Sequence, residues 1–476
     1  MDYLKPKISN PEKAANILFV LIAFGLILAC LLGDSLGEGG DSTTHYLYAK
    51  LSWENPSYFF YHWAKPLFTL LSSPFAQFGM KGMMLFNVFC SIAAAYLARC
   101  TAKVLQFNYY YITGILVLSM PLILPVTLSG LTEPLSALLV ILAVYCYLTN
   151  KIFWAIFLAS ILPFVRSEGL IIVGVFGALL LFEKQWKYLP ILAAGHLVFA
   201  ILGWSYHHDF WWVFNKIPYA TMSSVYGNGN WTHFLNQLYF CVQPFTFAMM
   251  LISLIYLPIE WVQKGSKMHW PKLFLIYGIV LAFVAAHSAF WALGIFNSMG
   301  LNRVLVTIFP LCAVMAMQSI HAITSKLQAS SAYTQSFMVF FMSGILIFPT
   351  LNNPAATKFK EAIYINKQHQ FLRDILMPYL QQKHPNKSYF FSETEIGLFT
   401  SKDIFKQKQW LYPGAKVPPQ NMQIGDVFVF DSLLMAAERN ISLTAIRQIT
   451  NLKEDTVFAF TNNQNKFTQY HLFVKQ

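Results

Sequence analysis

Asp41 follows two glycines in the segment 37–45 (GEGGDSTTH), shortly after the first long apolar run. Glycine lets a backbone approach a bound molecule closely, and a carboxylate beside lipid gains affinity for protons, which suits a general base. The same pattern is typical of a helix N-terminus, so a capping role for Asp41 is the structural alternative. His45 lies one turn later on the same face. Its alternatives are a metal ligand, a residue that orients a substrate, and an interfacial hydrogen-bonding histidine.

Two further charged clusters, at 132–134 (TEP) and 166–169 (RSEG), also mark the ends of apolar segments. Glu133 followed by proline is typical of the first turn of a helix. Arg166 and Glu168 separate two short apolar runs, and a charge near hydrocarbon costs about 2.5–3.5 kcal/mol on insertion scales unless it is paired or serves a cavity. They are therefore either functional charges or an ion pair that neutralises a tight turn.

Lys65 in the segment 61–66 (YHWAKP) and Arg303 in the segment 299–303 (MGLNR) are basic residues beside apolar runs. Cations that converge near one carboxylate would stabilise an anionic leaving group, such as a phosphate departing from a sugar. The alternative for both is that the side chain snorkels to lipid headgroups.

The composition indicates the environment of these charges. Of 476 residues, 56% are hydrophobic and 11% charged, and the mean hydropathy is +0.48, which leaves too little polar surface for a soluble globule. Apolar runs long enough, or almost long enough, to cross a bilayer lie at 14–33, 82–99, 109–127, 134–149, 152–165, 169–182, 188–206, 241–262, 273–295, 303–321 and 334–351. We predict an all-α polytopic membrane bundle of about eleven transmembrane helices. The segment 66–78 is shorter and is interpreted as interfacial or re-entrant.

The order of these runs predicts an orientation. With a cytoplasmic N-terminus, lysine and arginine are more frequent in the inner loops, and all the charged clusters lie on the outer face. Residues 352–476 contain short alternating runs at 388–392 and 427–431, typical of strands. We therefore divide the chain into a transmembrane catalytic domain, 1–351, and a small extracytoplasmic α/β domain, 352–476.

Other classes of site are weakly indicated. The net charge of +12 follows from this topology and a mildly basic tail, with no nucleic-acid signal. The six cysteines all fall within or at the ends of apolar runs, so neither a disulfide framework nor a cysteine metal site is expected. A tail without cysteine favours a bacterial inner membrane. The segment 207–209 (HHD) matches no helical metal-ligand spacing.

Asp41 in the first outer loop, the segments 131–134 (LTEP) and 166–169 (RSEG), and the segment 300–303 (GLNR) occur in an order and spacing that resemble the GT-C superfamily of multispanning glycosyltransferases. The resemblance is to members that use polyprenyl-phosphate-linked sugars, such as mannosyltransferases and aminoarabinose transferases. It implies a helical bundle with a lipid-facing groove and the first-loop aspartate as catalytic base. Ser42 stands where many relatives have a second acidic residue, which leaves a divalent metal as cofactor an open question.

The expected reaction is a direct displacement on a polyprenyl-phosphate-linked sugar, because an outward-facing enzyme has no nucleotide-sugar supply and the sequence has no phosphate-binding glycine-rich lysine motif. Asp41 takes a proton from an acceptor hydroxyl, Lys65, Arg166 and Arg303 stabilise the departing phosphate, and Glu133 and Glu168 orient cations or sugar hydroxyls. The acceptor would be a lipid, a lipid-linked glycan or a protein. Two alternatives are a transporter or lipid flippase, which predicts polar groups near the bilayer midplane, and an enzyme that moves whole lipid-linked glycans.

Overall fold

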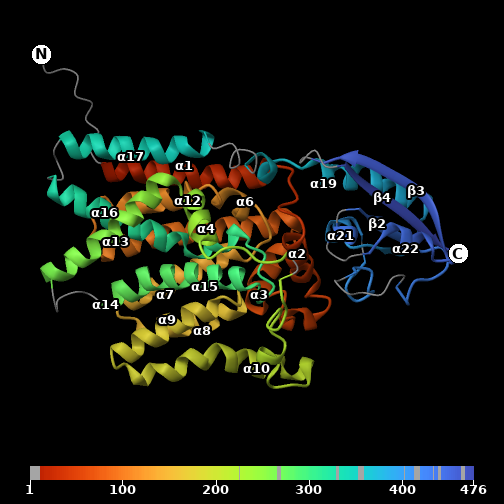
Figure 1. Ribbon diagram of the computed structural model, residues 1–476, viewed down its shortest axis with the longest axis horizontal. Coiled ribbons are helices and arrows are strands. Elements are labelled where there is room, and N and C mark those ends of the chain that lie inside the picture. The colour runs from red at the N-terminus through yellow and green to blue at the C-terminus, as the bar shows by residue number, and fades with distance from the viewer. Residues whose placement is uncertain are drawn as a thin grey trace, which may run out of the picture.

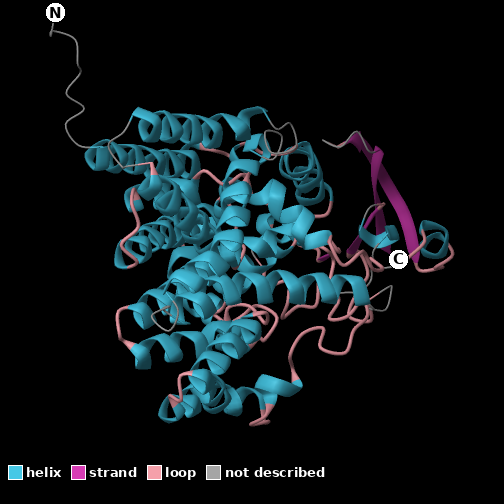
Figure 2. Cartoon of the chain, turned by 60° about the vertical axis from the view of Figure 1, so that its left-hand side comes forward, coloured by secondary structure: helices cyan, strands magenta, loops and turns pink. Residues whose placement is uncertain are grey.

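The computed structural model describes residues 11–224, 226–264, 270–327, 332–351, 359–400, 402–411, 419–432, 434–437, 441–462 and 467–476. Most of this chain is a bundle of helices whose long members lie side by side, with a small sheet at one end (Figure 1). A second view shows the strands gathered on that same side of the molecule (Figure 2).

The α-helices of the bundle are α1 (Pro11–Leu32), α2 (Asp41–Leu51), α3 (Pro66–Ala76), α4 (Gly79–Val104), α5 (Thr113–Leu118), α6 (Ile123–Thr127), α7 (Glu133–Leu148), α8 (Ile152–Ile161), α9 (Gly169–Phe182), α10 (Ala194–His207), α11 (Trp212–Asn215), α12 (His233–Val242), α13 (Pro244–Lys264), α14 (Trp270–Lys272), α15 (Ile279–Leu293), α16 (Phe309–Lys326) and α17 (Ala332–Leu351). Short 3-10 or π segments extend several of them: η1 (Pro56–Phe60), η2 (Tyr110–Ile112), η3 (Leu162–Phe164), η4 (Trp186–Ala193), η6 (Leu273–Gly278) and η7 (Asn302–Ile308).

Within the described residues, six helical segments are long and apolar enough to cross a membrane: 11–32, 79–104, 186–207, 244–262, 270–293 and 302–326. Four shorter apolar helical segments accompany them, and α3 is one of these. The predicted all-helical polytopic architecture is confirmed at this level. The number of crossings stays a prediction.

The expected continuous span at 109–127 is wrong, because this segment is broken into η2, α5 and α6. Pro121 interrupts it, since proline has no amide proton to donate within a helix. The break frees the carbonyl of Ser119, which accepts a hydrogen bond from the buried side-chain amide of Gln243. Such a partner is required because no water is available in the bilayer core.

The tail forms the predicted α/β structure. Its elements are α19 (Lys367–Phe371), η8 (Leu372–Leu376), α20 (Met377–Lys383), β1 (Tyr389–Phe390), η9 (Thr394–Phe399), β2 (Val427–Asp431), α21 (Leu434–Ala437), α22 (Leu443–Arg447), β3 (Leu452–Thr461) and β4 (Phe467–Lys475). The strand order is β1-β2-β4-β3, with β1 parallel to β2 and the other pairs antiparallel. The predicted boundary at 351/352 adjoins residues 352–358, which lie outside the described residues.

The tail and the bundle share a hydrophobic core. One buried hydrophobic cluster contains Leu47 of α2 together with Ile396 and Tyr470 of the tail. Tyr48 stacks on Phe405 with ring centroids 4.0 Å apart. Since α2 begins at Asp41, the tail lies directly behind the segment that carries the candidate base.

Helix α10 approaches α8 through Gly195, whose amide donates to Ser160 Oγ at 3.1 Å. A Cβ at Gly195 would lie 2.1 Å from the Ser160 carbonyl oxygen, whereas a Cβ at Gly174 in α9 would meet nothing within 4 Å. We predict that Gly195→Ala destabilises the protein by about 1–3 kcal/mol through overpacking, while Gly174→Ala does not destabilise it. Thermal unfolding of both variants in the same detergent measures this. Equal melting temperatures for the two would contradict the packing of α10 on α8.

Candidate active site

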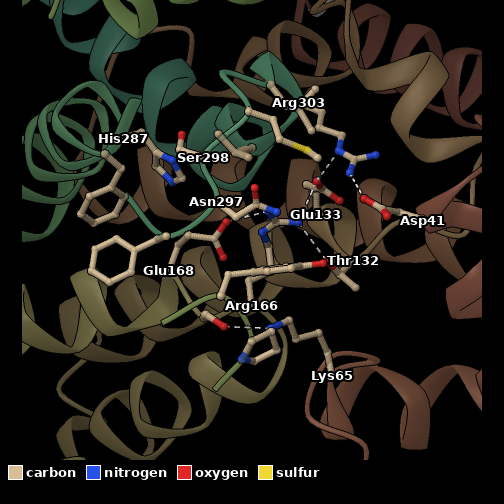
Figure 3. Close-up of a pocket in the computed structure, with 18 of the residues that line it drawn as sticks. Asp41, Lys65, Thr132, Glu133, Arg166, Glu168, His287, Asn297, Ser298 and Arg303 are labelled. Atoms are coloured by element: carbon tan, nitrogen blue, oxygen red, sulfur yellow. Dashed lines mark hydrogen bonds and ion pairs between the residues drawn. The ribbon is translucent and has the colours of Figure 1, made fainter. Parts of the chain in front are cut away.

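A cavity of about 410 Å³ lies where the loops before α2, α3, α7 and α9 meet η7. All seven residues singled out in the sequence line it: Asp41, His45, Lys65, Glu133, Arg166, Glu168 and Arg303. In Figure 3, Asp41 and Arg303 lie at one side of this cavity and His287 at the other. The structure thus joins charges that are far apart along the chain into one site.

Glu133 is the electrostatic centre of the site. Its side chain, the first of α7, is fully buried. Arg166 Nη1 lies 2.7 Å and Arg303 Nε 3.5 Å from the same Oε1 atom of this carboxylate. One buried negative charge is therefore shared by two guanidinium groups, which keeps both of them in place.

Arg166 is further fixed by its neighbours. It donates to Thr132 Oγ1 at 3.0 Å and pairs with Glu168 Oε1 at 2.7 Å. The ion pair of Arg166 with Glu168, which was one of the two alternatives from the sequence, is therefore present, but it belongs to a larger network. Burial raises the pKa of Glu168, and the nearby Arg166 charge more than offsets this, so that the pKa falls to about 2. Glu168 is ionised at neutral pH and orients a cation.

Asp41 forms an ion pair with Arg303, and Arg303 Nη1 also lies 3.0 Å from Glu38 Oε2. The Asp41 side chain remains 45% exposed on the cavity wall. Its partial burial raises the pKa, but the guanidinium of Arg303 outweighs this effect and holds the pKa of Asp41 below its usual value. The expected raised proton affinity is thus wrong, because a cation and not lipid is the nearest neighbour of this carboxylate.

Asp41 does not cap its helix with its side chain. The N-cap of α2 is Gly40, and no side-chain capping bond is made there. Ser42, which stands in the place of a second acidic residue, accepts the Gly130 amide proton at 2.7 Å. Ser42 therefore joins α2 to the loop before α7, a structural task that leaves Asp41 free to face the cavity.

Lys65 is a cation without a carboxylate partner among the residues that the structure describes. It precedes α3 with a φ of +66°, and Nζ donates to Ser167 Oγ at 2.8 Å. Burial lowers the pKa of Lys65 to about 8. A non-glycine residue held at positive φ, with its ammonium directed into a cavity, is more consistent with anion binding than with snorkelling to headgroups.

His45 is neutral in this structure, because burial lowers its pKa to about 3. Its Nδ1 lies 3.2 Å from the Ala64 carbonyl oxygen, so the proton sits on Nδ1 and Nε2 is an acceptor. The ring stacks on Trp63 at 4.8 Å, and Trp63 donates to the hydroxyl of Tyr219 at 2.6 Å. His45 therefore makes the interfacial hydrogen bond considered from the sequence and is held in one tautomer.

Several lining residues were not predicted from the sequence: Trp63, His287, Asn297 and Ser298. His287 lies within the apolar helix α15, and its Nε2 is buried with no hydrogen-bond partner among the described residues. An ionisable residue inside an apolar span is itself a functional signal, which could have identified it. The loop with Asn297 could not be predicted, because its backbone conformation, with φ of +49° at that residue, has no sequence signature.

The segment 207–209 has a structural role. His207 Nε2 bonds the Phe60 carbonyl oxygen at 2.8 Å, and Asp209 accepts the Trp211 amide proton at 2.8 Å. Over the part of the chain that the structure describes, no group of three His, Cys, Asp or Glu side chains is arranged to hold a metal. Around Asp41 the carboxylates Glu38 and Glu133 are already paired with arginine. The donor set therefore does not fit a metal centre.

No family model and no curated protein sequence matches the chain. Its fold does match a solved structure, ArnT from Cupriavidus metallidurans bound to undecaprenyl phosphate. The TM-score is 0.61 at 11% sequence identity, and the match covers 95% of this chain and 97% of that one. The chain therefore shares the fold of this protein over nearly its whole length.

Replacing Glu133 by glutamine should leave the two buried guanidinium groups without their shared counter-ion. We predict a loss of about 3–5 kcal/mol of unfolding free energy, as for other broken buried pairs. Glu38→Gln is the matched control, because it removes a half-exposed partner of the same Arg303 and should cost about 1 kcal/mol or less. Denaturant unfolding in detergent compares them. An equally small loss for both variants would show that Glu133 does not hold the arginines.

Proposed function

We propose that this protein is an integral-membrane glycosyltransferase that moves a hexosyl or pentosyl group from a polyprenyl-phosphate carrier to an acceptor hydroxyl. The observation that carries the proposal is a carboxylate, Asp41, in the wall of a cavity that also contains the ammonium of Lys65 and the guanidiniums of Arg166 and Arg303. This set can bind a phosphate and accept a proton within one site. A fold shared with a protein solved with undecaprenyl phosphate supports the same donor class.

The proposed topology has eleven crossings with the N-terminus in the cytoplasm. The cavity and the tail, 352–476, then lie on the outer face, and residues 1–351 form the catalytic domain. The helical segments at 109–127, 133–148, 152–164, 169–182 and 332–351 add five crossings to those of the six long ones. We assign the protein to the bacterial inner membrane, where polyprenyl-phosphate sugars replace nucleotide sugars on the outer face.

In the proposed donor complex the phosphate lies between Lys65 and Arg303. Among the described residues, the hydrogen-bond partner of Lys65 is the Ser167 hydroxyl and not a carboxylate, so an incoming phosphate meets an ammonium without an ion-pair partner there. His287 lies on the side of the cavity away from Asp41, and Ser298 also lines the cavity; there Nε2 of His287 can bond a sugar hydroxyl (Figure 3). Thus the headgroup and the sugar occupy different ends of the cavity.

The ion pair of Asp41 with Arg303 indicates how the base is activated. A phosphate beside Arg303 competes for the guanidinium, weakens its hold on Asp41 and so raises the proton affinity of Asp41. Asp41 then takes the proton of the acceptor hydroxyl while the oxygen attacks the anomeric carbon. The bond from that carbon to the phosphate oxygen breaks, and its electrons leave with the polyprenyl phosphate. One displacement inverts the configuration, and no step requires a metal.

A transporter or flippase is the second candidate. It needs polar groups near the membrane midplane that face both sides in turn. The cavity charges instead lie at the ends of helices, at Asp41, Glu133 and just before Gly169. Helix α2, which begins at Asp41, lies on the side of the bundle that carries the tail (Figure 1). The arrangement favours chemistry at one face.

Asp41→Asn tests the assignment of the base. The amide keeps the size of the side chain but cannot take a proton, so transfer should fall at least about 100-fold, the low end for a general base. The assay follows release of undecaprenyl phosphate from a panel of undecaprenyl-phosphate-linked pentoses and hexoses, with a bacterial membrane extract as acceptor. Expression and melting temperature serve as controls. Near-normal turnover would end the assignment, and no release with the wild-type protein would contradict the proposed function.

The low pKa of Lys65 predicts a pH-dependent affinity for the carrier. The pKa of Lys65 in the folded protein, about 8, lies below its usual value of 10.5, so the ammonium is charged below pH 8 and loses its charge above it. Binding of undecaprenyl phosphate should therefore weaken as pH rises from 7 to 9. Lys65→Arg keeps its charge throughout and should remove this dependence. Quenching of tryptophan fluorescence, with Trp63 in the cavity wall, measures both. The same pH profile for the two proteins would exclude Lys65 as the phosphate ligand.

A further inference from the structure

The tail reaches into the loop that presents Asp41. Glu395 of η9 accepts the amide proton of Gly40, and the Thr394 hydroxyl donates to the Gly40 carbonyl oxygen at 3.2 Å. More than 350 residues separate these partners along the chain. The peptide groups on both sides of Gly40 are thus held from the tail, one residue before the candidate base.

The backbone of this loop can take its shape only because it is made of glycine. Gly39 has a φ of +82° and Gly40 a φ of +44°. A Cβ at Gly39 would lie 2.3 Å from Oε1 of Glu395, so the carboxylate occupies the space that a side chain would need. The N-terminus of α2 has no side-chain capping bond. Glu395 instead places a negative charge there, at the positive end of the dipole of α2.

Glu395 is itself firmly held. Its side chain is buried, and His369 Nε2 lies 3.7 Å from Oε1. Behind it, Glu393 accepts hydrogen bonds from Tyr470 and, at 2.5 Å, from Gln368. Burial and the neighbouring Glu395 raise the pKa of Glu393. Burial alone would raise the pKa of Glu395 too. The interactions of Glu395 with His369 and with the Gly40 amide outweigh burial, so the pKa of Glu395 is lowered. Of the two carboxyl groups, Glu395 is therefore the stronger acid.

We propose that Glu395 is a positioning residue for the transfer reaction, and that the C-terminal segment thereby acts as part of the catalytic machinery. By fixing Gly39 and Gly40 it sets the direction in which Asp41 leaves the first turn of α2, toward the cavity and Arg303. This inference rests on the proposed function, because it assigns Asp41 the role of base.

If the tail served only to stabilise the fold, its other contacts with the bundle would be sufficient. Tyr58 donates to Asp403 at 2.9 Å, and Tyr48 stacks on Phe405. These contacts dock the tail on α2 and η1 without touching residues 37–41. Asp403 therefore offers a matched control, a carboxylate that joins the tail to the bundle but does not hold the loop of Asp41.

The experiment compares Glu395→Ala, Glu395→Gln and Asp403→Asn in the full-length protein. Hydrogen–deuterium exchange of a peptide covering residues 33–46 should be faster in Glu395→Ala than in the wild-type protein. In Glu395→Gln, which keeps an acceptor oxygen, exchange should be slower than in Glu395→Ala. In Asp403→Asn it should equal that of the wild-type protein. In the carrier-release assay, Glu395→Ala should lower kcat about 100-fold, as expected for a reacting group displaced by about 1 Å, with KM for the donor within about twofold. Glu395→Gln should recover part of kcat.

Gly39→Ala provides an independent disturbance of the same contact and should reproduce the Glu395→Ala effects on exchange and kcat. Unchanged exchange in Glu395→Ala, or equal losses in Glu395→Ala and Asp403→Asn, would overturn the inference. The exchange measurement needs no substrate, so it tests the hold on the loop even if the wild-type protein transfers no sugar. In that case the proposed function is contradicted, but the exchange measurement still tests whether Glu395 holds the loop.

Discussion

A charge buried beside a membrane must be paired, and in this protein one fully buried carboxylate meets that requirement for two arginines. Glu133 binds Arg166 from the loop before α9 and Arg303 from η7. Each of these residues lies at the end of an apolar segment, so the pairing fixes how several helices are placed relative to one another. The cavity is a consequence of this constraint, because its charged wall consists of the groups that the pairing brings together.

In the proposed reaction, the same constraint keeps Asp41 a weak base until a ligand binds. Arg303 is shared among Glu38, Asp41 and Glu133, and it lowers the proton affinity of Asp41. Lys65 has no such partner among the described residues and is the cation left for a phosphate. In our proposal the anionic donor pairs with Lys65, competes with Asp41 for Arg303 and so releases the base in one event. Coupling of this kind would prevent Asp41 from acting before the donor is bound.

Much of this arrangement could be predicted from the sequence, because charges at the ends of apolar runs are rare and the order of the runs places them on one face. The α/β structure of the tail could also be predicted, because its sequence contains short alternating runs typical of strands. The break at 119–122 and the low pKa of Asp41 could not be predicted, since both depend on partners, Gln243 and Arg303, that are distant in the chain. The contact of Glu395 with Gly40 has no local pattern at all.

The central claim is that the phosphate of a polyprenyl carrier binds between Lys65 and Arg303, close to Asp41. A cryo-electron microscopy structure of the protein in lipid nanodiscs with undecaprenyl phosphate tests it most directly. We predict headgroup density in hydrogen-bond contact with Lys65 Nζ and with Arg303, and a separation of Asp41 from Arg303. Headgroup density outside this cavity, with the pair of Asp41 and Arg303 intact, would contradict the account.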